Sequence, residues 1–402
     1  MAIIVQKYGG SSVADLTRVG LVADRVVAAR RAGNDVVVVV SAMGKTTDQL
    51  LALARGLSDA PPRRELDMLL SVGERTTMAL LAIALGARGV DAISFTGSQS
   101  GILTNDRHFD ARIIEVRPFR IEDELARGRV VIVAGYQGMS YRREITTLGR
   151  GGSDTTAVAL AAALRAERCE IYSDVDGVYS ADPRVVAEAE HLPAVGYEAL
   201  QEMAEAGAKV LNAEAVAFAR RERIAIYARR TSDEVDSPAR RETVVSDDAP
   251  RHAGGVIAVV GDLQVVWLEG APRGGLAALL RCADEAGVSL RALNVEGGVV
   301  GALVSTLRVP DWRARKAPFE ALGMTALEPD TDVAQGIVSL VGDGLAEDAS
   351  VLRRALDAAD ALGVTVNGVT SGPFRVALRV QAGHVNALTV ALHRRFVGTT
   401  AV

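Results

Sequence analysis

The sequence predicts an α/β protein in two halves: a mainly parallel sheet flanked by helices, followed by two ferredoxin-like βαββαβ domains. In the first half, short apolar runs rich in Val and Ile alternate with longer segments that have helical spacing, as in a buried parallel sheet. In the second half, a unit of about 70 residues with the order β-α-β-β-α occurs twice, which is typical of ferredoxin-like domains.

The first half alternates strands and helices from its start. The expected strands are 3–5, 36–40, 92–95, 130–134, 170–173 and 226–228. The expected helices are 13–31, 75–86, 155–164 and 197–206. Ligands of such sheets bind beyond the carboxyl ends of the strands. At that edge we expect to find Lys7, Gly9, Ser41, Ser173 and Asp174.

Composition changes between the two halves. A stretch rich in Asp, Glu, Arg, Ser and Pro follows the last expected strand and is typical of a linker. We therefore expect a first domain at 1–230, a linker at 231–255, and the two repeats at 256–335 and 336–402. The first strand of the repeat at 256–335 is expected to be shared with the repeat at 336–402. Each repeat should close with a short strand, and a unit so small buries its sheet best against its twin or a second subunit.

Composition also narrows the class of protein. Hydrophobic residues make up 49% of the 402 residues but aromatic residues only 4%, so the core must consist mainly of Ala, Val, Leu and Ile. The net charge of -5 argues against a nucleic-acid partner. Apolar runs such as 36–40 are of strand length, so no membrane partner is expected. Cys169 and Cys282 form no disulfide framework, and no signal peptide is recognised at the N-terminus, so we expect a cytoplasmic protein.

A glycine-rich turn before an Ala-rich helix is the most informative segment. It reads Gly149-Arg150-Gly151-Gly152-Ser153-Asp154. Adjacent glycines allow positive φ and a close approach of backbone N–H groups to an anion. Ser153 or Asp154 would cap the helix, whose N-terminus favours negative charge. The turn alone is equally compatible with simple helix capping.

A second glycine turn favours the anion-binding interpretation. Lys7-Tyr8-Gly9-Gly10-Ser11-Ser12 directly follows the first expected strand. Two such turns at strand-to-helix junctions indicate two anionic ligands.

These motifs resemble the aspartate kinases, a family within the amino-acid kinase superfamily. The resemblance rests on 7–13 and 144–154, and further on 96–101, 173–179, 182–184 and 207–211, which follow in the family's order. It covers roughly the first 230 residues, and the repeat that follows is similar in pattern to the paired ACT domains of these enzymes. The resemblance therefore implies an amino-acid kinase catalytic domain followed by two ACT domains.

The resemblance implies ATP-dependent phosphorylation of the side-chain carboxylate of L-aspartate to 4-phospho-L-aspartate, the first step of the aspartate-family amino-acid pathway. That carboxylate has a pKa of about 3.9 and is already ionised, so the reaction needs no general base. Lys7 would neutralise the transferring phosphoryl group and Asp154 would orient Lys7. Mg²⁺ would be held mainly by the ATP phosphates and water rather than by protein ligands.

By resemblance, further residues divide between the two substrates. The expected aspartate-binding residues are Ser41, Thr47, Glu74, Arg150, Gly151, Gly152 and Ser153, with Glu74 pairing with the ammonium. The expected ATP-binding residues are Lys7, Gly9, Gly10, Ser11, Ser173, Asp174, Tyr179, Asp182, Arg184 and Lys209.

The sequence departs from the family pattern in both halves. Asn212-Ala213 stands where the family usually has His-Pro. The ACT domains usually carry an Asp-x-Pro-Gly-like turn, and at that place this chain has residues 271–275. They also carry an Asn-Ile-Asp/Glu segment on the next strand, and there the two repeats have residues 289–291 and 365–367. Loss of acidic and amide groups would weaken lysine or threonine feedback or leave a rebuilt pocket for another effector. The ACT pair also implies at least a homodimer.

Two other functions stay open on the sequence. One is a catalytically idle regulatory paralogue that acts through ACT-mediated association. The other is an amino-acid kinase for a different substrate, such as glutamate, an N-acylated acid or a nucleotide. Lys7, Glu74, Arg150 and Asp154 are all present, which favours an active aspartate kinase.

Overall fold

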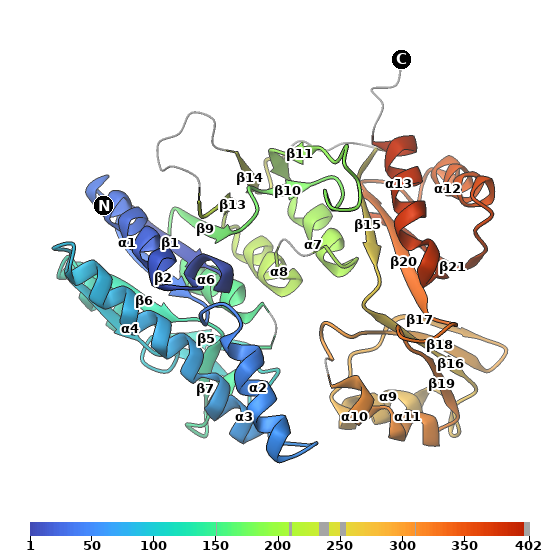
Figure 1. Cartoon of the computed structure of the whole chain (residues 1–402), viewed down its shortest axis with the longest axis horizontal. Helices are drawn as coiled ribbons and strands as arrows, with labels where there is room; N and C mark the ends of the chain where they lie inside the picture. The colour runs from blue at the N-terminus through green and yellow to red at the C-terminus, as the bar shows by residue number, and fades with distance from the viewer. Residues whose placement is uncertain (150, 209–210, 233–240, 250–254, 310, 398–402) are drawn as a thin grey trace. The chain divides into compact units, whose positions relative to one another are not determined.

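The computed structural model describes residues 1–149, 151–208, 211–232, 241–249, 255–309 and 311–397 (Figure 1). These residues form two compact units. The first unit comprises Met1–Val178, Leu192–Gln201 and Val210–Pro250. The second comprises Tyr179–His191, Glu202–Lys209 and Arg251–Val402. Each unit is described separately.

An eight-stranded sheet forms the centre of the first unit, with the order β12-β14-β13-β9-β1-β2-β6-β3. Six of its strands run parallel to one another and correspond to the six expected ones: β1 (Ile3–Tyr8), β2 (Asp35–Val40), β3 (Ala92–Phe95), β6 (Val130–Ala134), β9 (Arg168–Ser173) and β13 (Ile226–Arg230). At the edge, β14 (Glu242–Val245) runs antiparallel to β13 and is flanked by β12 (Ala194–Val195). Residues 242–245 of the expected linker are therefore part of the sheet.

Helices cover both faces of this sheet because its central strands are apolar on both sides. Alternate residues of β1 and β2, including Ile4, Val36 and Val38, pack with α1 (Leu16–Arg31) and α4 (Val72–Gly86) in one core cluster. Helix α6 (Gly152–Ala163) packs on β1, β2 and β9, and α8 (Ala213–Glu222) packs against α6. The predicted helices 13–31, 75–86, 155–164 and 197–206 are confirmed, the first with a short 3-10 turn (η1, Gly10–Val13) before it and the last as α7 (Tyr197–Glu205).

Shorter elements of the first unit had no clear signal in the sequence. Four described helices were not expected: α2 (Thr46–Leu57), α3 (Arg63–Leu70), α5 (Phe119–Ala126) and α8. A small second sheet has the order β5-β4-β7-β8, formed by β4 (Ile102–Thr104), β5 (Ile113–Val116), β7 (Gln137–Ser140) and β8 (Ile145–Thr147). A pair of two-residue strands, β10 (Val178–Tyr179) and β11 (His191–Leu192), lies where the chain passes between the units.

One apolar stretch, Arg63–Gly86, is long and apolar enough to cross a bilayer by length and composition alone, with a mean hydropathy of 1.5. It consists of α3 and α4 joined at Ser71. Leu81 and Leu85 of α4 are fully buried against α1 and the sheet. The apolar character of the stretch is thus accounted for by the core of the first unit.

The second unit contains two four-stranded antiparallel sheets. The first has the order β17-β18-β16-β19: β16 (Val265–Gly270), β17 (Arg291–Glu296), β18 (Val299–Ser305) and β19 (Met324–Leu327), with α9 (Gly275–Ala286), α10 (Trp312–Arg315) and α11 (Ala317–Ala321). The second has the order β15-β20-β22-β21: β15 (Val256–Asp262), β20 (Gln335–Gly342), β21 (Val366–Gly372) and β22 (Arg375–Gln381), with α12 (Ala349–Ala361), η2 (Ala382–His384) and α13 (Val385–Phe396).

The two repeats complete their sheets differently. The first repeat closes with β19, whose Met324 lies opposite Gly270 of β16. In the second, the corresponding edge is occupied by β15, which precedes the first repeat and pairs antiparallel with β20. The expectation that each repeat supplies its own closing strand is therefore correct for the first repeat only. Together the two units confirm the predicted fold class.

Candidate active site

A buried ion pair joins the end of β1 to the start of α6. Lys7 Nζ lies 2.6 Å from Asp154 Oδ1, and the two residues are only 9% and 8% exposed. The helix begins at Gly152, so Ser153 and Asp154 lie inside its first turn and neither caps it; that expectation was wrong. Instead, Asp154 faces the sheet, where a carboxylate in the first helical turn is favoured by the helix dipole.

The glycine turn before α6 needs its glycines. Gly149 and Gly151 both have a φ of 75°, which confirms the expected positive φ. A Cβ on Gly152 would lie 2.6 Å from Leu148 Cβ, so this position must also lack a side chain. Ser153 lies beside the end of β6, since a Cβ on Gly135 would be 2.8 Å from Ser153 Oγ. Arg150 lies outside the described residues.

Asn212, which stands where the family usually has His, lies against this turn. Its side-chain oxygen caps α8 by accepting hydrogen bonds from Glu214 N at 2.8 Å and Ala215 N at 3.2 Å. A Cβ on Gly151 would collide with the amide group of Asn212. The residue thus both starts α8 and limits the space at Gly151.

The loops after β1 and β2 are held together by backbone contacts. Gly44 N donates to Gly10 O at 3.0 Å, and Ser41 N donates to Tyr8 O at 3.1 Å. A Cβ on Gly10 would lie 3.0 Å from Ala42 O, so glycine allows this close approach. Thr47 follows in the first turn of α2, and Ser11 lies in η1 just after Gly10.

Glu74 is a buried carboxylate with one unused oxygen. It lies in the first turn of α4 and is 3% exposed. Its Oε1 accepts a hydrogen bond from Ala42 N at 3.1 Å, whereas the buried Oε2 has no hydrogen-bond partner among the described residues. Burial raises the pKa of the Glu74 carboxyl to about 7. A charged carboxylate at this place therefore requires a cation that the described residues do not supply.

The start of the expected nucleotide side adjoins the same loops. Gly9 N donates to Tyr172 O at 3.2 Å, which places the end of β9 beside Gly9. Ser173 Oγ accepts a hydrogen bond from Val175 N at 3.2 Å, and Asp174 is exposed. The expectation that Lys7, Gly9, Ser41 and Ser173-Asp174 converge at the carboxyl ends of the strands agrees with this geometry.

The other expected nucleotide residues belong to the second unit, so the structure does not place them relative to Lys7. Arg184 Nη2 lies 2.7 Å from Asp182 Oδ2, and both side chains are exposed. The Tyr179 ring packs edge-on against His191, with 5.4 Å between ring centroids. Next to Tyr179, the buried Ser180 Oγ contacts His393 Nε2 of α13 at 2.8 Å. Lys209 lies outside the described residues.

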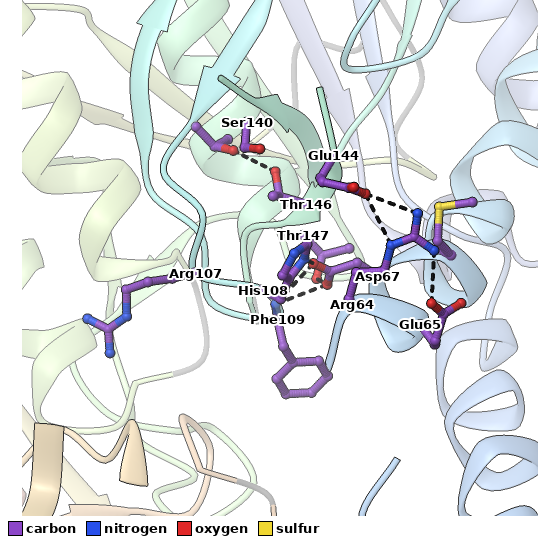
Figure 2. A network of polar contacts seen from close by, with 12 residues as sticks. Arg64, Glu65, Asp67, Arg107, His108, Phe109, Ser140, Glu144, Thr146 and Thr147 are labelled. Atoms are coloured by element: carbon purple, nitrogen blue, oxygen red, sulfur yellow. Dashed lines mark hydrogen bonds and ion pairs between the residues drawn. The ribbon is translucent and has the colours of Figure 1, made fainter. Parts of the chain in front are cut away.

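Sequence analysis did not identify Asp67, His108 and Thr147, which form a buried polar cluster beside the glycine turn (Figure 2). Asp67 lies between Leu66 and Leu70 on the buried face of α3. An acidic residue among the apolar positions of a short amphipathic helix was the signal in the sequence that could have indicated this cluster. Among the described residues, no group of three His, Cys, Asp or Glu side chains is arranged to hold a metal ion.

Glu74 predicts a pH dependence of stability. Its folded-state pKa of about 7 lies above the ordinary value of 4.5, so the folded protein binds more protons between these pH values and loses stability as pH rises through them. The free energy of unfolding of Glu74→Gln should therefore rise relative to that of the wild type as pH increases, by up to about 3 kcal/mol at about pH 8. Thermal unfolding of the ligand-free proteins at low and high pH measures this difference.

The exposed Glu122→Gln on α5 is the matched control and should show no such gain. A stability difference between Glu74→Gln and the wild type that stays the same from low pH to about pH 8 would show that Glu74 bears no buried charge.

Comparison with known proteins agrees with this arrangement. The model of the amino acid kinase family matches residues 2–228. The aspartokinase of Mycolicibacterium smegmatis is 42% identical over 410 residues, which cover 98% of this chain and 96% of that protein. Aspartokinase III of E. coli in complex with aspartate and ADP (R-state) has a TM-score of 0.82 at 24% identity and covers 97% of this chain and 99% of its own.

The structure of the same E. coli enzyme in complex with lysine and aspartate (T-state) has a TM-score of 0.73 at 23% identity and covers 98% of this chain and 99% of its own. These two structures share the fold of this chain, and the M. smegmatis relative shows the family at full length. With the Lys7–Asp154 pair and the two glycine turns in place, the chain belongs to the amino acid kinase family and, within it, to the aspartokinases.

Proposed function

We propose that the protein transfers the γ-phosphoryl group of ATP to the side-chain carboxylate of L-aspartate, forming 4-phospho-L-aspartate. The observation that carries this proposal is Glu74, a buried carboxylate with one unused oxygen near the carboxyl ends of the strands. The ammonium group of a free amino acid is the cation that would satisfy it. Membership of the aspartokinases supports aspartate as that amino acid.

The chemistry needs positioning and charge neutralisation. The acceptor carboxylate is ionised at neutral pH, so no base has to remove a proton before attack. The transferring phosphoryl group carries negative charge over its oxygens, and fixed positive charge stabilises it. Lys7 supplies this charge from the end of a buried strand, and Asp154 fixes the direction of the ammonium group at 2.6 Å.

The remaining aspartate-binding candidates would complete a pocket for two carboxylates. Glu74 takes the ammonium group, and the glycine turn offers N–H groups at the N-terminus of α6. Arg150 would supply a forked donor to a substrate carboxylate. Hydroxyl groups and further backbone would come from Ser41, Thr47, Gly151, Gly152 and Ser153.

ATP would bind along the turn after β1 and the end of β9. The proposed contacts in the first unit are Lys7, Gly9, Gly10, Ser11, Ser173 and Asp174. Further contacts are proposed for Tyr179, Asp182, Arg184 and Lys209. Mg²⁺, held mainly by phosphate oxygens and water, would neutralise part of the phosphate charge.

Two alternatives are less well supported. A catalytically idle paralogue would not need to keep Lys7 and Asp154 paired and Glu74 buried. A kinase for an N-acylated acid or a nucleotide would have no free ammonium group for Glu74. Aspartate-dependent release of ADP by the purified protein is the measurement that separates the three functions.

We propose that the domains follow this division of labour. Residues 1–230 would carry catalysis together with β14 from the expected linker 231–255, the rest of which would connect. Residues 256–335 and 336–402 would regulate and associate. The edge strands β17 and β21 expose Leu293, Val295 and Val369, and exposed edges of this kind favour pairing with a second copy. A homodimer through the ACT domains, in the cytoplasm, fits these features and the free cysteines Cys169 and Cys282.

The structure changes the basis for the expected feedback. Residues 289–290 precede β17, whose own sequence includes the exposed Asn294 and Glu296. The first repeat thus keeps an amide and an acid on this strand. In the second repeat, the side-chain amide of Asn367 on β21 donates to Gln335 Oε1 at 2.9 Å instead. We propose altered feedback by lysine or threonine, with any remaining effector contact in the first repeat.

Removing either partner of the buried pair should abolish most of the turnover. We expect Lys7→Ala and Asp154→Asn each to lower kcat by about 100-fold or more, because a fixed charge at the transferring group is lost or misdirected. A coupled assay of ADP release at saturating aspartate and ATP measures this, with circular dichroism to confirm folding. Near-wild-type turnover in either variant would refute the assigned roles.

Arg150→Ala should mainly raise the apparent KM for aspartate. A residue that binds a substrate carboxylate equally in the ground and transition states contributes to binding rather than to kcat. Arg142→Ala, an exposed arginine of the neighbouring hairpin, is the control and should behave as the wild type. If only the KM for ATP changes in Arg150→Ala, Arg150 belongs to the nucleotide site.

Lysine and threonine should inhibit the full chain weakly or not at all, and light scattering should give at least the mass of a dimer. Whatever inhibition remains should disappear in Glu296→Gln, because the acidic partner of the effector ammonium is lost. Titration of each amino acid at saturating ATP checks this. Strong inhibition at submillimolar effector, or a monomer, would contradict the proposal.

A further inference from the structure

A buried carboxylate on α3 accepts hydrogen bonds from two distant segments (Figure 2). Asp67 is 0% exposed. Thr147 Oγ1 donates to Asp67 Oδ1 at 2.5 Å, and His108 Nδ1 lies 2.6 Å from Asp67 Oδ2. Phe109 N donates to the same carboxylate at 3.0 Å and 3.2 Å. Such a set of donors satisfies both oxygens of a carboxylate that burial would otherwise destabilise.

The segments joined by Asp67 border the glycine turn. Thr147 is the last residue of β8 and is followed directly by Leu148 and Gly149. Ala111 N donates to Thr147 O at 2.9 Å. A Cβ on Gly149 would lie 3.1 Å from Asp110 Oδ1 and 3.6 Å from Phe109 O. The loop that carries His108 and Phe109 therefore lies against the turn that leads to Ser153.

The backbone conformation of Phe109 shows that surrounding contacts fix this loop. Its φ is 71°, in the left-handed region that a bulky residue avoids. Such a conformation persists where the surroundings fix it. The hydrogen bonds from Phe109 N to Asp67 are contacts of this kind.

We propose that Asp67 is a positioning residue for aspartate: through Thr147 and the His108–Phe109 loop it fixes Leu148 and Gly149, the base of the glycine turn, on α3. The inference rests on the proposed function, since that turn carries the proposed aspartate contacts Gly151, Gly152 and Ser153. Asp67 itself does not touch the substrate in this assignment. Its effect is on the geometry of the donors, and small displacements of such donors reduce the rate strongly.

The same helix and hairpin offer an internal comparison. Arg64 of α3 lies 3.0 Å from Glu144, just before β8, but the two side chains are 46% and 40% exposed (Figure 2). This pair also joins α3 to the β8 strand, but at the end of β8 that lies away from the glycine turn. Exposed pairs of this kind contribute little. Glu144→Gln is therefore the matched control for the buried contact.

The test compares Thr147→Val, which keeps the shape and removes the hydroxyl, with Thr147→Ser, which keeps the hydroxyl, in the full chain. We expect Thr147→Val to lower kcat/KM for aspartate by about 10- to 100-fold, with the KM for ATP near wild type. The thermal midpoint should fall by only about 2 to 4 °C, because Phe109 N still donates to Asp67 Oδ1. Thr147→Ser should restore most of the loss, and Glu144→Gln should behave as the wild type.

Hydrogen exchange of the peptide that spans residues 145–154 gives a readout that does not depend on activity. Thr147→Val should exchange faster there, and Thr147→Ser should not. An inactive wild type would refute the proposed function, whereas exchange would still report on the positioning role. Unchanged exchange and kinetics in Thr147→Val, or a general loss of stability with both KM values altered, would overturn the positioning role.

Discussion

The ion pair between Lys7 and Asp154 is the interaction on which the site depends. A lysine at the end of a central parallel strand is acceptable in the core only if an opposite charge meets it there. Asp154 can do so because α6 begins at Gly152 and presents its first turn to the sheet. The position of that helix start depends in turn on the glycine turn before it, where Gly149 and Gly151 adopt positive φ.

Glu74 represents the opposite arrangement, a buried carboxylate to which the described residues supply no cation. Its Oε2 has no hydrogen-bond partner among the described residues, and burial raises its pKa to about 7. Binding sites often keep such a group at a stability disadvantage because the ligand supplies the missing partner. Lys7 thus meets an opposite charge within the protein, whereas the proposed function assigns the partner of Glu74 to a ligand.

The second unit contains more than the two repeats. It includes Tyr179–His191 and Glu202–Lys209, two segments from within the kinase half of the sequence. The first is held by Ser180 and His393, and the second by Glu205, which forms ion pairs with Arg291 and with Arg308. The proposed nucleotide contacts Tyr179, Asp182 and Arg184 thus belong to a segment that packs with the ACT repeats.

The sequence by itself determined the fold class, the six parallel strands and the two glycine turns, because each follows from local periodicity or from the φ that glycine permits. It did not reveal β14 or the small sheet, since very short strands have little periodicity and strand pairing is a long-range choice. It suggested Ser153 or Asp154 as a helix cap, but the structure has Gly151 at that position. Asp154 lies beside Lys7 instead, a partnership that only the family resemblance implied. Only the tertiary structure identified Asp67, because a carboxylate's donors can come from residues 41 and 80 positions away along the chain.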